Sequence, residues 1–301
     1  MKLSIITINY NGSESTIKLL NSLAKQTDRD FQILVIDNAS EEPDFSNLKL
    51  STSQVDNLKI IRNSQNLGFS GGNNVGIKKA LEIGASWVLL LNNDTWVEEG
   101  FIASIKAILS QKQGIVGVPL DEGEHIAYAG KIEWLRPTLR HEYRITNYVS
   151  RTESRNTKYE LRNTNFYAIG GGMLIYKDVF PKIGFLDEKY FLYFEDADFC
   201  IRAKKADIPI SIADGVMAYH NISATTKKLG SSLLLRYHYR NALYFNLKNG
   251  PWYIKILVWP WSLIILLKQM VKVMIYHNRE QSLAILNGVL DFYKNKMGKI
   301  I

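Results

Sequence analysis

The chain of 301 residues carries 37 Lys and Arg, 29 Asp and Glu, and a single cysteine. This length suits a substantial core in one large α/β domain or in two lobes, and one cysteine excludes an intrachain disulfide. The formal charge of +8 is uneven, because residues 221–301 hold a net charge of +10 and residues 1–220 a net charge of −2. Such a basic tail is typical of a contact with nucleic acid or with an anionic membrane surface.

Apolar runs alternate with helical periodicity over the first part of the chain. Strands are predicted over residues 3–9, 31–37, 58–62, 87–91 and 115–118. Helices are predicted over residues 13–24, through residues 80–83 after a glycine-rich loop at 66–74, and over residues 98–111. Repeated strand–helix units predict an α/β fold with a mostly parallel central sheet flanked by helices.

The strand at residues 87–91 runs directly into Asn92, Asn93, Asp94 and Thr95. Sheets of this kind bind ligands just beyond the carboxyl ends of their strands, so Asp94 is expected at the mouth of a site. A carboxylate beside amide oxygens suits Mg²⁺ or Mn²⁺ held against nucleotide phosphates. The same tetrapeptide also fits a turn that caps the next helix, and taken alone it favours that turn.

Periodicity fades over residues 120–166, which we interpret as surface structure or a loop over the site. Three glycines at 170–172 then precede an apolar strand that ends at Tyr176. Glycine at these positions fits backbone packed closely against a ligand such as a sugar, and fits a tight turn equally well.

Three carboxylates, Glu195, Asp196 and Asp198, follow a strongly aromatic run. Like charges in apolar surroundings have raised pKa values and are commoner at functional sites than elsewhere. The alternative is the first turn of a helix, in which acidic residues are favourable and Arg202 pairs with Asp198.

His220 follows a short strand predicted at residues 216–219. A lone histidine is more often structural than a ligand. The position after a strand end nevertheless lets His220 meet Asp94 across the site, as a nitrogen ligand or a phosphate contact.

The basic tail is also apolar. Its uncharged run, residues 256–267, is shorter than the ~20 residues that span a bilayer, and Pro260 interrupts it, so no transmembrane helix is expected. A helix starting at Pro260 places Lys268, Lys272 and Arg279 on one side and leaves a broad apolar face, typical of a helix lying on a membrane. The alternative is packing on the protein's own catalytic domain or on a second subunit. Nucleic acid is not expected as a partner.

Six motifs in this order resemble those of the inverting glycosyltransferases of family 2. They are SIITINYNG at 4–12, VIDNAS at 35–40, NLGFSGGN at 66–73, LNND at 91–94, FEDADFCIR at 194–202, and His220 with Ser223. The resemblance covers residues 1–225 and extends to Arg240 and Asn241. It is strongest to the bacterial rhamnosyltransferase-like enzymes of surface polysaccharide synthesis.

The resemblance implies a GT-A fold, with a Rossmann-like sheet and a C-terminal helical extension. Its nucleotide-sugar-binding half is expected at residues 1–118 and its acceptor-binding, catalytic half at residues 119–225. Residues 226–301 are expected to form the basic amphipathic helical region.

Roles are carried over by matching motifs. The residues expected to bind the nucleotide are Asn9, Tyr10, Asp37, Asn66, Gly68, Asn73 and Asn93. Among them, Asp37 is expected to accept a hydrogen bond from the imide N–H of uracil or thymine. The residues expected to contact the sugar or acceptor are Gly171, Gly172 and Asp198.

Asp94 and His220 are expected to hold Mg²⁺ or Mn²⁺ on the diphosphate, and the cation stabilises the leaving group. Asp196 is expected to take the proton of the attacking sugar hydroxyl, with Glu195 as its alternative or support. One departure from the family matters: Asn92 is neutral where the metal motif is often Asp-x-Asp, so cation binding should be weaker.

The expected function is transfer of a sugar, first of all rhamnose, from a dTDP- or UDP-sugar to a glycan or lipid-linked glycan. Residues 3–8 form a strand rather than a signal peptide, so a cytoplasmic protein at the inner face of the membrane is expected, with a homo-oligomer also considered. Two rival interpretations are a non-catalytic sugar-nucleotide-binding scaffold subunit and a sugar nucleotidyltransferase. The second would need Arg and Lys beside a glycine-rich start, which Asn11 and Gly12 do not provide.

Overall fold

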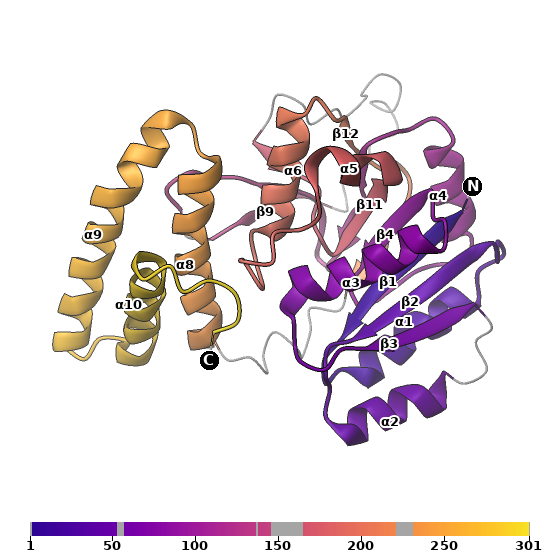
Figure 1. Ribbon diagram of the computed structural model, residues 1–301, viewed down its shortest axis with the longest axis horizontal. Coiled ribbons are helices and arrows are strands. Elements are labelled where there is room, and N and C mark those ends of the chain that lie inside the picture. Colours follow the sequence, from indigo (N-terminus) through magenta and orange to yellow (C-terminus); the bar gives the residue numbers. More distant parts are fainter. Residues whose placement is uncertain (1, 53–56, 137, 146–164, 221–230, 301) are drawn as a thin grey trace.

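The computed structural model describes residues 2–52, 57–136, 138–145, 165–220 and 231–300. An α/β body is followed by three C-terminal helices that lie together beside it (Figure 1). The predicted fold class, a central sheet flanked by helices with a helical extension, is confirmed.

A mostly parallel sheet of seven strands forms the centre of the body. Its strands, in spatial order, are β12 (Ile210–Ile212), β6 (Ile115–Gly117), β11 (Gly172–Tyr176), β4 (Trp87–Leu91), β1 (Leu3–Asn9), β2 (Phe31–Asp37) and β3 (Leu58–Arg62). β11 alone runs antiparallel to its neighbours within this sheet, between β4 and β6. The carboxyl ends of β1, β2 and β4 therefore meet at one edge, where their polar residues gather.

Helices cover both faces of this sheet. They are α1 (Ser13–Ala24), α2 (Glu42–Ser51), α3 (Gly68–Glu82), α4 (Phe101–Leu109), α5 (Phe180–Ile183) and α6 (Glu195–Lys205), with a 3₁₀ turn at Lys177–Val179. Strand side chains alternate between the two faces, so Ile6 packs in one core with Ile77 of α3, and Ile5 in the other with Leu20 of α1.

The glycine-rich segment at residues 66–74 is not mainly a loop, as the sequence suggested, because α3 already begins at Gly68. Its glycines let the helix lie very close to the sheet. A Cβ at Gly76 would be 2.5 Å from the Ile6 side chain, and one at Gly72 would be 2.9 Å from the Asn38 amide. Close packing therefore explains these glycines.

A second, smaller sheet contains part of residues 120–166, the segment without clear periodicity in the sequence. Its strands are β10 (Phe166–Tyr167), β8 (His125–Lys131), β7 (Leu120–Asp121), β13 (Ala218–His220) and β5 (Thr95–Trp96), with β9 (Arg140–Ile145) paired to β8. Residues 146–164 of the same segment lie outside the described residues.

The C-terminal helices are α8 (Ser231–Asn249), α9 (Trp252–Met274) and α10 (Arg279–Tyr293). They share a small apolar core of their own, which contains Leu243 of α8, Val258 and Ile265 of α9, and Val289 of α10. The opposite side of α9 faces outward at the edge of the molecule (Figure 1).

Pro260 does not interrupt the helix, which corrects the prediction that a helix starts there. α9 begins at Trp252 and passes through Pro260. Buried Ile254 and Val258 anchor the two turns before the proline in the bundle, and this packing offsets the one backbone hydrogen bond that proline removes. Among the described residues, α9 is the one helix long and apolar enough to cross a membrane on length and composition alone.

Candidate active site

Two adjoining cavities lie beyond the carboxyl ends of β1 and β4. The first has a volume of about 150 Å³ and the second about 350 Å³. Four residues line both of them: Phe69, Asn92, Asn93 and Leu192. A ligand that fills one cavity would therefore touch the wall of the other.

The first cavity collects most of the residues predicted to bind a nucleotide. Those that line it are Tyr10, Asn66, Gly68, Asn73 and Asn93. Asn66 Oδ1 accepts a hydrogen bond of 2.8 Å from the Gly68 amide, which shapes the turn into α3. Gly68 has a φ of +73°, and a Cβ there would lie 2.3 Å from the carbonyl oxygen of Phe191, so no other residue fits.

Asn9 and Asp37 differ from expectation, since both are fully buried beneath this cavity and neither lines it. Asn9 Nδ2 donates to Asp37 Oδ1 at 2.9 Å and to Ser40 Oγ at 3.0 Å. Arg62 Nε lies 3.5 Å from Asp37 Oδ2. These contacts fix the loops after β1 and β2, and contact of Asn9 or Asp37 with the base stays a prediction.

The second cavity brings Asp94 and His220 together, as the sequence predicted. Their Oδ1 and Nε2 atoms are 3.1 Å apart, and His220 Nδ1 lies 3.8 Å from Glu122 Oε1. Burial lowers the pKa of His220, but the contacts with Asp94 and Glu122 outweigh burial and raise it to about 9. The imidazole therefore carries a proton between two carboxylates at neutral pH.

Glu122 and His141 belong to this cluster and were not found from the sequence. His141 Nδ1 lies 3.3 Å from Glu122 Oε1. The nearby imidazoles of His141 and His220 lower the pKa of Glu122 to about 2. Both residues come from the segment without periodicity, which carried no signal for them.

The donor set fits a divalent cation only in part. In the part of the chain that the structure describes, no group of three or more His, Cys, Asp or Glu is arranged to hold a metal. Asp94 offers an oxygen ligand, and His220 would offer a nitrogen ligand once a cation displaces the proton on Nε2. Mn²⁺ and Mg²⁺ accept such ligands when phosphate oxygens and water complete the shell.

Glu195 and Asp196 lie in the first turn of α6 and line the second cavity. Asp196 accepts backbone hydrogen bonds from Gly170 at 2.9 Å and from Ala197 at 2.7 Å. Glu195 Oε2 is buried with no hydrogen-bond partner among the described residues. Burial raises the pKa of both carboxyls, and that of Glu195 well above its usual range. The pair therefore favours a proton on Glu195 and a charge on Asp196.

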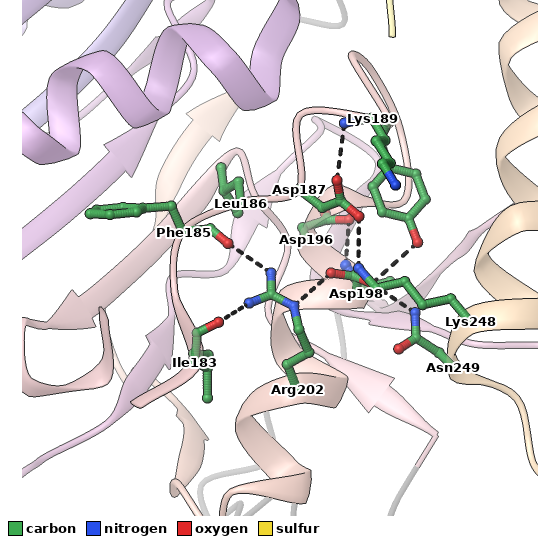
Figure 2. A network of polar contacts seen from close by, with 12 residues as sticks. Ile183, Phe185, Leu186, Asp187, Lys189, Asp196, Asp198, Arg202, Lys248 and Asn249 are labelled. Atoms are coloured by element: carbon green, nitrogen blue, oxygen red, sulfur yellow. Dashed lines mark hydrogen bonds and ion pairs between the residues drawn. The ribbon is translucent and has the colours of Figure 1, made fainter. Parts of the chain in front are cut away.

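Asp198 does not reach either cavity. It is fully buried, and its carboxylate lies 2.8 Å from Arg202 Nε and 2.7 Å from Lys248 Nζ (Figure 2). Asn249 Nδ2 donates to it at 2.8 Å. The ion pair within the helix that the sequence offers as an alternative is thus present, and Asp198 links α6 to α8. Its contact with a sugar stays a prediction.

Gly171 and Gly172 have different surroundings. Gly171 lines the second cavity, whereas Gly172 begins β11 and does not line it. A Cβ at Gly172 would lie 2.8 Å from the Val118 carbonyl oxygen, so close strand packing explains it.

Tyr193 and His238 also line the second cavity and were missed. Their rings stack with centroids 4.1 Å apart at an angle of 14°. Burial lowers the pKa of His238 to about 4, so its imidazole is neutral. His238 belongs to α8, and the sequence around it does not indicate that this helix reaches a cavity formed by residues 69–220.

Comparisons with known proteins identify the family and the fold. Residues 4–184 match the family model described as Glycosyl transferase family 2. The low-salt glycan biosynthesis hexosyltransferase Agl10 of Haloferax volcanii is 28% identical over 254 residues, with 79% of this chain and 73% of that protein covered. The dTDP-rhamnosyl transferase RfbF of Shigella flexneri is 23% identical over 255 residues, with coverage of 81% and 79%.

The fold is also similar to that of the mannosyltransferase PcManGT from Pyrobaculum calidifontis, solved in complex with GDP-Man and Mn²⁺. The TM-score is 0.55 at 12% identity, with 98% of this chain and 87% of that chain covered. The motifs, the GT-A fold and the family match agree, so the predicted resemblance to rhamnosyltransferase-like enzymes is confirmed. This chain belongs to glycosyl transferase family 2.

Proposed function

We propose that this protein is an inverting, metal-dependent glycosyltransferase of surface polysaccharide synthesis. It moves a sugar, rhamnose as first choice, from a dTDP- or UDP-sugar to a glycan or lipid-linked glycan acceptor. One observation carries the proposal: a cavity lined by the predicted nucleotide-binding residues adjoins a cavity that holds Asp94, His220 and Asp196. The first cavity is lined mainly by residues 1–118, whereas the second combines residues of 1–118, of 119–225 and of α8.

The nucleoside lies in the first cavity in this proposal. Tyr10 and the amides of Asn66, Asn73 and Asn93 offer an aromatic surface and hydrogen-bonding groups there. Asn9 and Asp37 act from below, because their contacts hold the loops that form the floor. The name of the Shigella flexneri relative supports dTDP as the nucleotide.

Asp94 and His220 would hold Mg²⁺ or Mn²⁺ at the junction of the two cavities. When bound, the cation neutralises charge on the departing nucleoside diphosphate. Glu122 lies near His220 Nδ1 and turns Nε2 toward Asp94, so it orients the ring as a carboxylate behind a histidine ligand does.

Asp196 accepts the proton of the acceptor hydroxyl as that oxygen attacks the anomeric carbon. Its two backbone hydrogen bonds stabilise the ionised form, whereas Glu195 Oε2 has no hydrogen-bond partner among the described residues and Glu195 keeps its proton. Glu195 then serves as a neutral hydrogen-bond donor to the acceptor. A single displacement on the face opposite the leaving group inverts the anomeric centre.

In this proposal the protein works in the cytoplasm at the inner face of the membrane, and the surface of α9 supports that contact. α9 exposes a continuous set of large apolar side chains, which includes Trp252, Ile256, Leu263, Leu267, Met270 and Met274. Exposed Lys268 lies beside this face, and the tail is strongly basic. An apolar helix face with adjacent cations suits an anionic bilayer surface.

A nucleotide screen tests the proposed donor. The melting temperature of the purified protein would be measured with UDP, dTDP, GDP and CMP, each with and without Mn²⁺. We expect dTDP or UDP to raise it only when Mn²⁺ is present, because a ligand that binds the folded state stabilises it by mass action. No shift with any nucleotide would favour the scaffold-subunit alternative.

Membrane contact is tested with one substitution and a matched control. Leu267→Glu removes an exposed leucine of α9, and Leu50→Glu makes the same change on α2, where leucine is 76% exposed. We expect Leu267→Glu to weaken binding to vesicles containing phosphatidylglycerol by about tenfold or more, since a leucine no longer enters the lipid. Leu50→Glu should bind like the unaltered protein.

Light scattering on the same proteins separates the alternatives. Equal vesicle binding by both variants would contradict the membrane contact. A change of oligomeric state in Leu267→Glu alone would assign the α9 face to a second copy of the chain.

A further inference from the structure

The aromatic loop between α5 and α6, residues 190–194, has an unfavourable backbone. Phe191, Tyr193 and Phe194 have φ angles of +65°, +69° and +76°. Residues with bulky side chains rarely adopt this left-handed conformation, so surrounding contacts must hold it.

Two neighbouring side chains of α8 supply such contacts. Asn241 Nδ2 lies within hydrogen-bond distance of three loop carbonyl oxygens, those of Tyr190 at 3.0 Å, Leu192 at 2.8 Å and Tyr193 at 3.2 Å. Arg240 Nη2 donates to the Tyr190 carbonyl at 3.1 Å, and its Nε donates to Asn241 Oδ1 at 3.0 Å. Both side chains are fully buried.

Arg240 also ties the end of the chain to the same place. Its Nη1 donates to the carbonyls of Lys296 at 3.2 Å and Gly298 at 2.8 Å. Burial lowers its pKa to about 10, so the guanidinium remains charged and is compensated by carbonyl oxygens. Burying a guanidinium is costly unless hydrogen bonds compensate it, and four oxygen acceptors do so here.

Ring stacking extends the contact along the loop. Tyr237 of α8 stacks on Phe191 with centroids 5.4 Å apart at 10°, next to the stack of His238 on Tyr193. From the other side, the Phe191 carbonyl accepts a 2.7 Å hydrogen bond from the Phe69 amide of α3. The loop is therefore held between α8 and the first turn of α3.

This loop contributes to the walls of both cavities. Phe191 and Leu192 line the first, and Leu192, Tyr193 and Phe194 line the second. A movement of the loop would change the shape of both cavities together.

We propose that Arg240 and Asn241 are positioning residues, which hold this strained loop so that donor and acceptor cavities keep their relative geometry. α8 lies beyond the family match at residues 4–184, yet it is part of the working site in this proposal. The inference rests on the proposed function for its effect on nucleotide binding, and on the contacts alone for the loop.

The test compares Asn241→Ala and Asn241→Asp with Asn249→Ala. The Asp variant keeps the shape and the Arg240 contact but has no N–H donors. Asn249 lies on the same helix, is 6% exposed, and donates a hydrogen bond of 2.8 Å to Asp198 Oδ1. Neither residue of this pair lines one of the two cavities. Asn249→Ala is therefore the control for removing a buried hydrogen bond from α8.

Amide hydrogen exchange of residues 190–194 and affinity for dTDP and UDP with Mn²⁺ would be measured for each protein. Both Asn241 variants should exchange faster in the loop and bind the nucleotide roughly tenfold more weakly or worse, because small displacements of lining groups weaken their contacts with the ligand. Asn249→Ala should match the unaltered protein in both measurements.

Exchange in the loop that is unchanged in the Asn241 variants, or equally raised in Asn249→Ala, would overturn the proposal. Faster exchange with unchanged nucleotide affinity would overturn it too. If the unaltered protein binds neither nucleotide, the proposed donor is wrong, and the exchange measurement alone decides whether Asn241 holds the loop.

Discussion

Asp196→Asn is expected to lower kcat for sugar transfer by about 10²- to 10⁴-fold, the usual contribution of a positioned general base. The amide has nearly the same shape as the carboxylate but accepts no proton. Donor affinity should change little, because Asp196 lines the second cavity and not the first. Turnover with dTDP- or UDP-sugar and nucleotide affinity would be measured on the same preparation.

Glu195→Gln is the matched comparison for this substitution. Burial and the nearby Asp196 raise the pKa of Glu195 well above its usual range, so its side chain is neutral and glutamine reproduces it. The loss of kcat should be much smaller than for Asp196→Asn. A larger loss from Glu195→Gln would exchange the two roles and make Glu195 the base.

The pH profile adds a second check on the same assignment. Burial raises the pKa of Asp196, and the base works only when ionised. Transfer should therefore fall as the pH drops through that raised pKa, above the value of about 3.9 for an exposed aspartate. An acid limb at or below the exposed value would contradict a buried base.

Asp94→Asn is expected to abolish the Mn²⁺ dependence of nucleotide binding and to lower kcat by about 10²-fold or more, since a cation contributes several kcal/mol to leaving-group stabilisation. Asn92 is already neutral, so the substitution leaves no carboxylate in the LNND motif. Calorimetric titration of dTDP and UDP with and without Mn²⁺ would measure the change.

Two further variants serve as comparisons for Asp94→Asn. Asn92→Asp supplies the second carboxylate of the family's usual motif and should strengthen Mn²⁺-dependent binding. Asp121→Asn, on β7 and outside the lining of both cavities, should leave it unchanged. Mn²⁺ dependence that survives in Asp94→Asn would remove Asp94 from the metal site.

The sequence could not separate the roles of the three carboxylates at the start of α6. Glu195, Asp196 and Asp198 look alike in sequence, and all three were assigned to the site. The structure separates them by their surroundings: Gly170 stabilises Asp196, while Arg202 and Lys248 neutralise Asp198 away from the cavities. Lys248 is 50 residues further along the chain than Asp198, so no local pattern could indicate this pairing.

The sequence by itself determined most strands of the central sheet and the strand end at Asp94, because buried strands follow from local apolar periodicity. The family followed from the resemblance of the motifs. Tertiary structure alone decided that Asn9 and Asp37 lie below the cavity, that Glu122 joins His220, and that Asn241 reaches the aromatic loop. These contacts join segments far apart in the chain. Their energies depend on burial and on partners that exist only after folding.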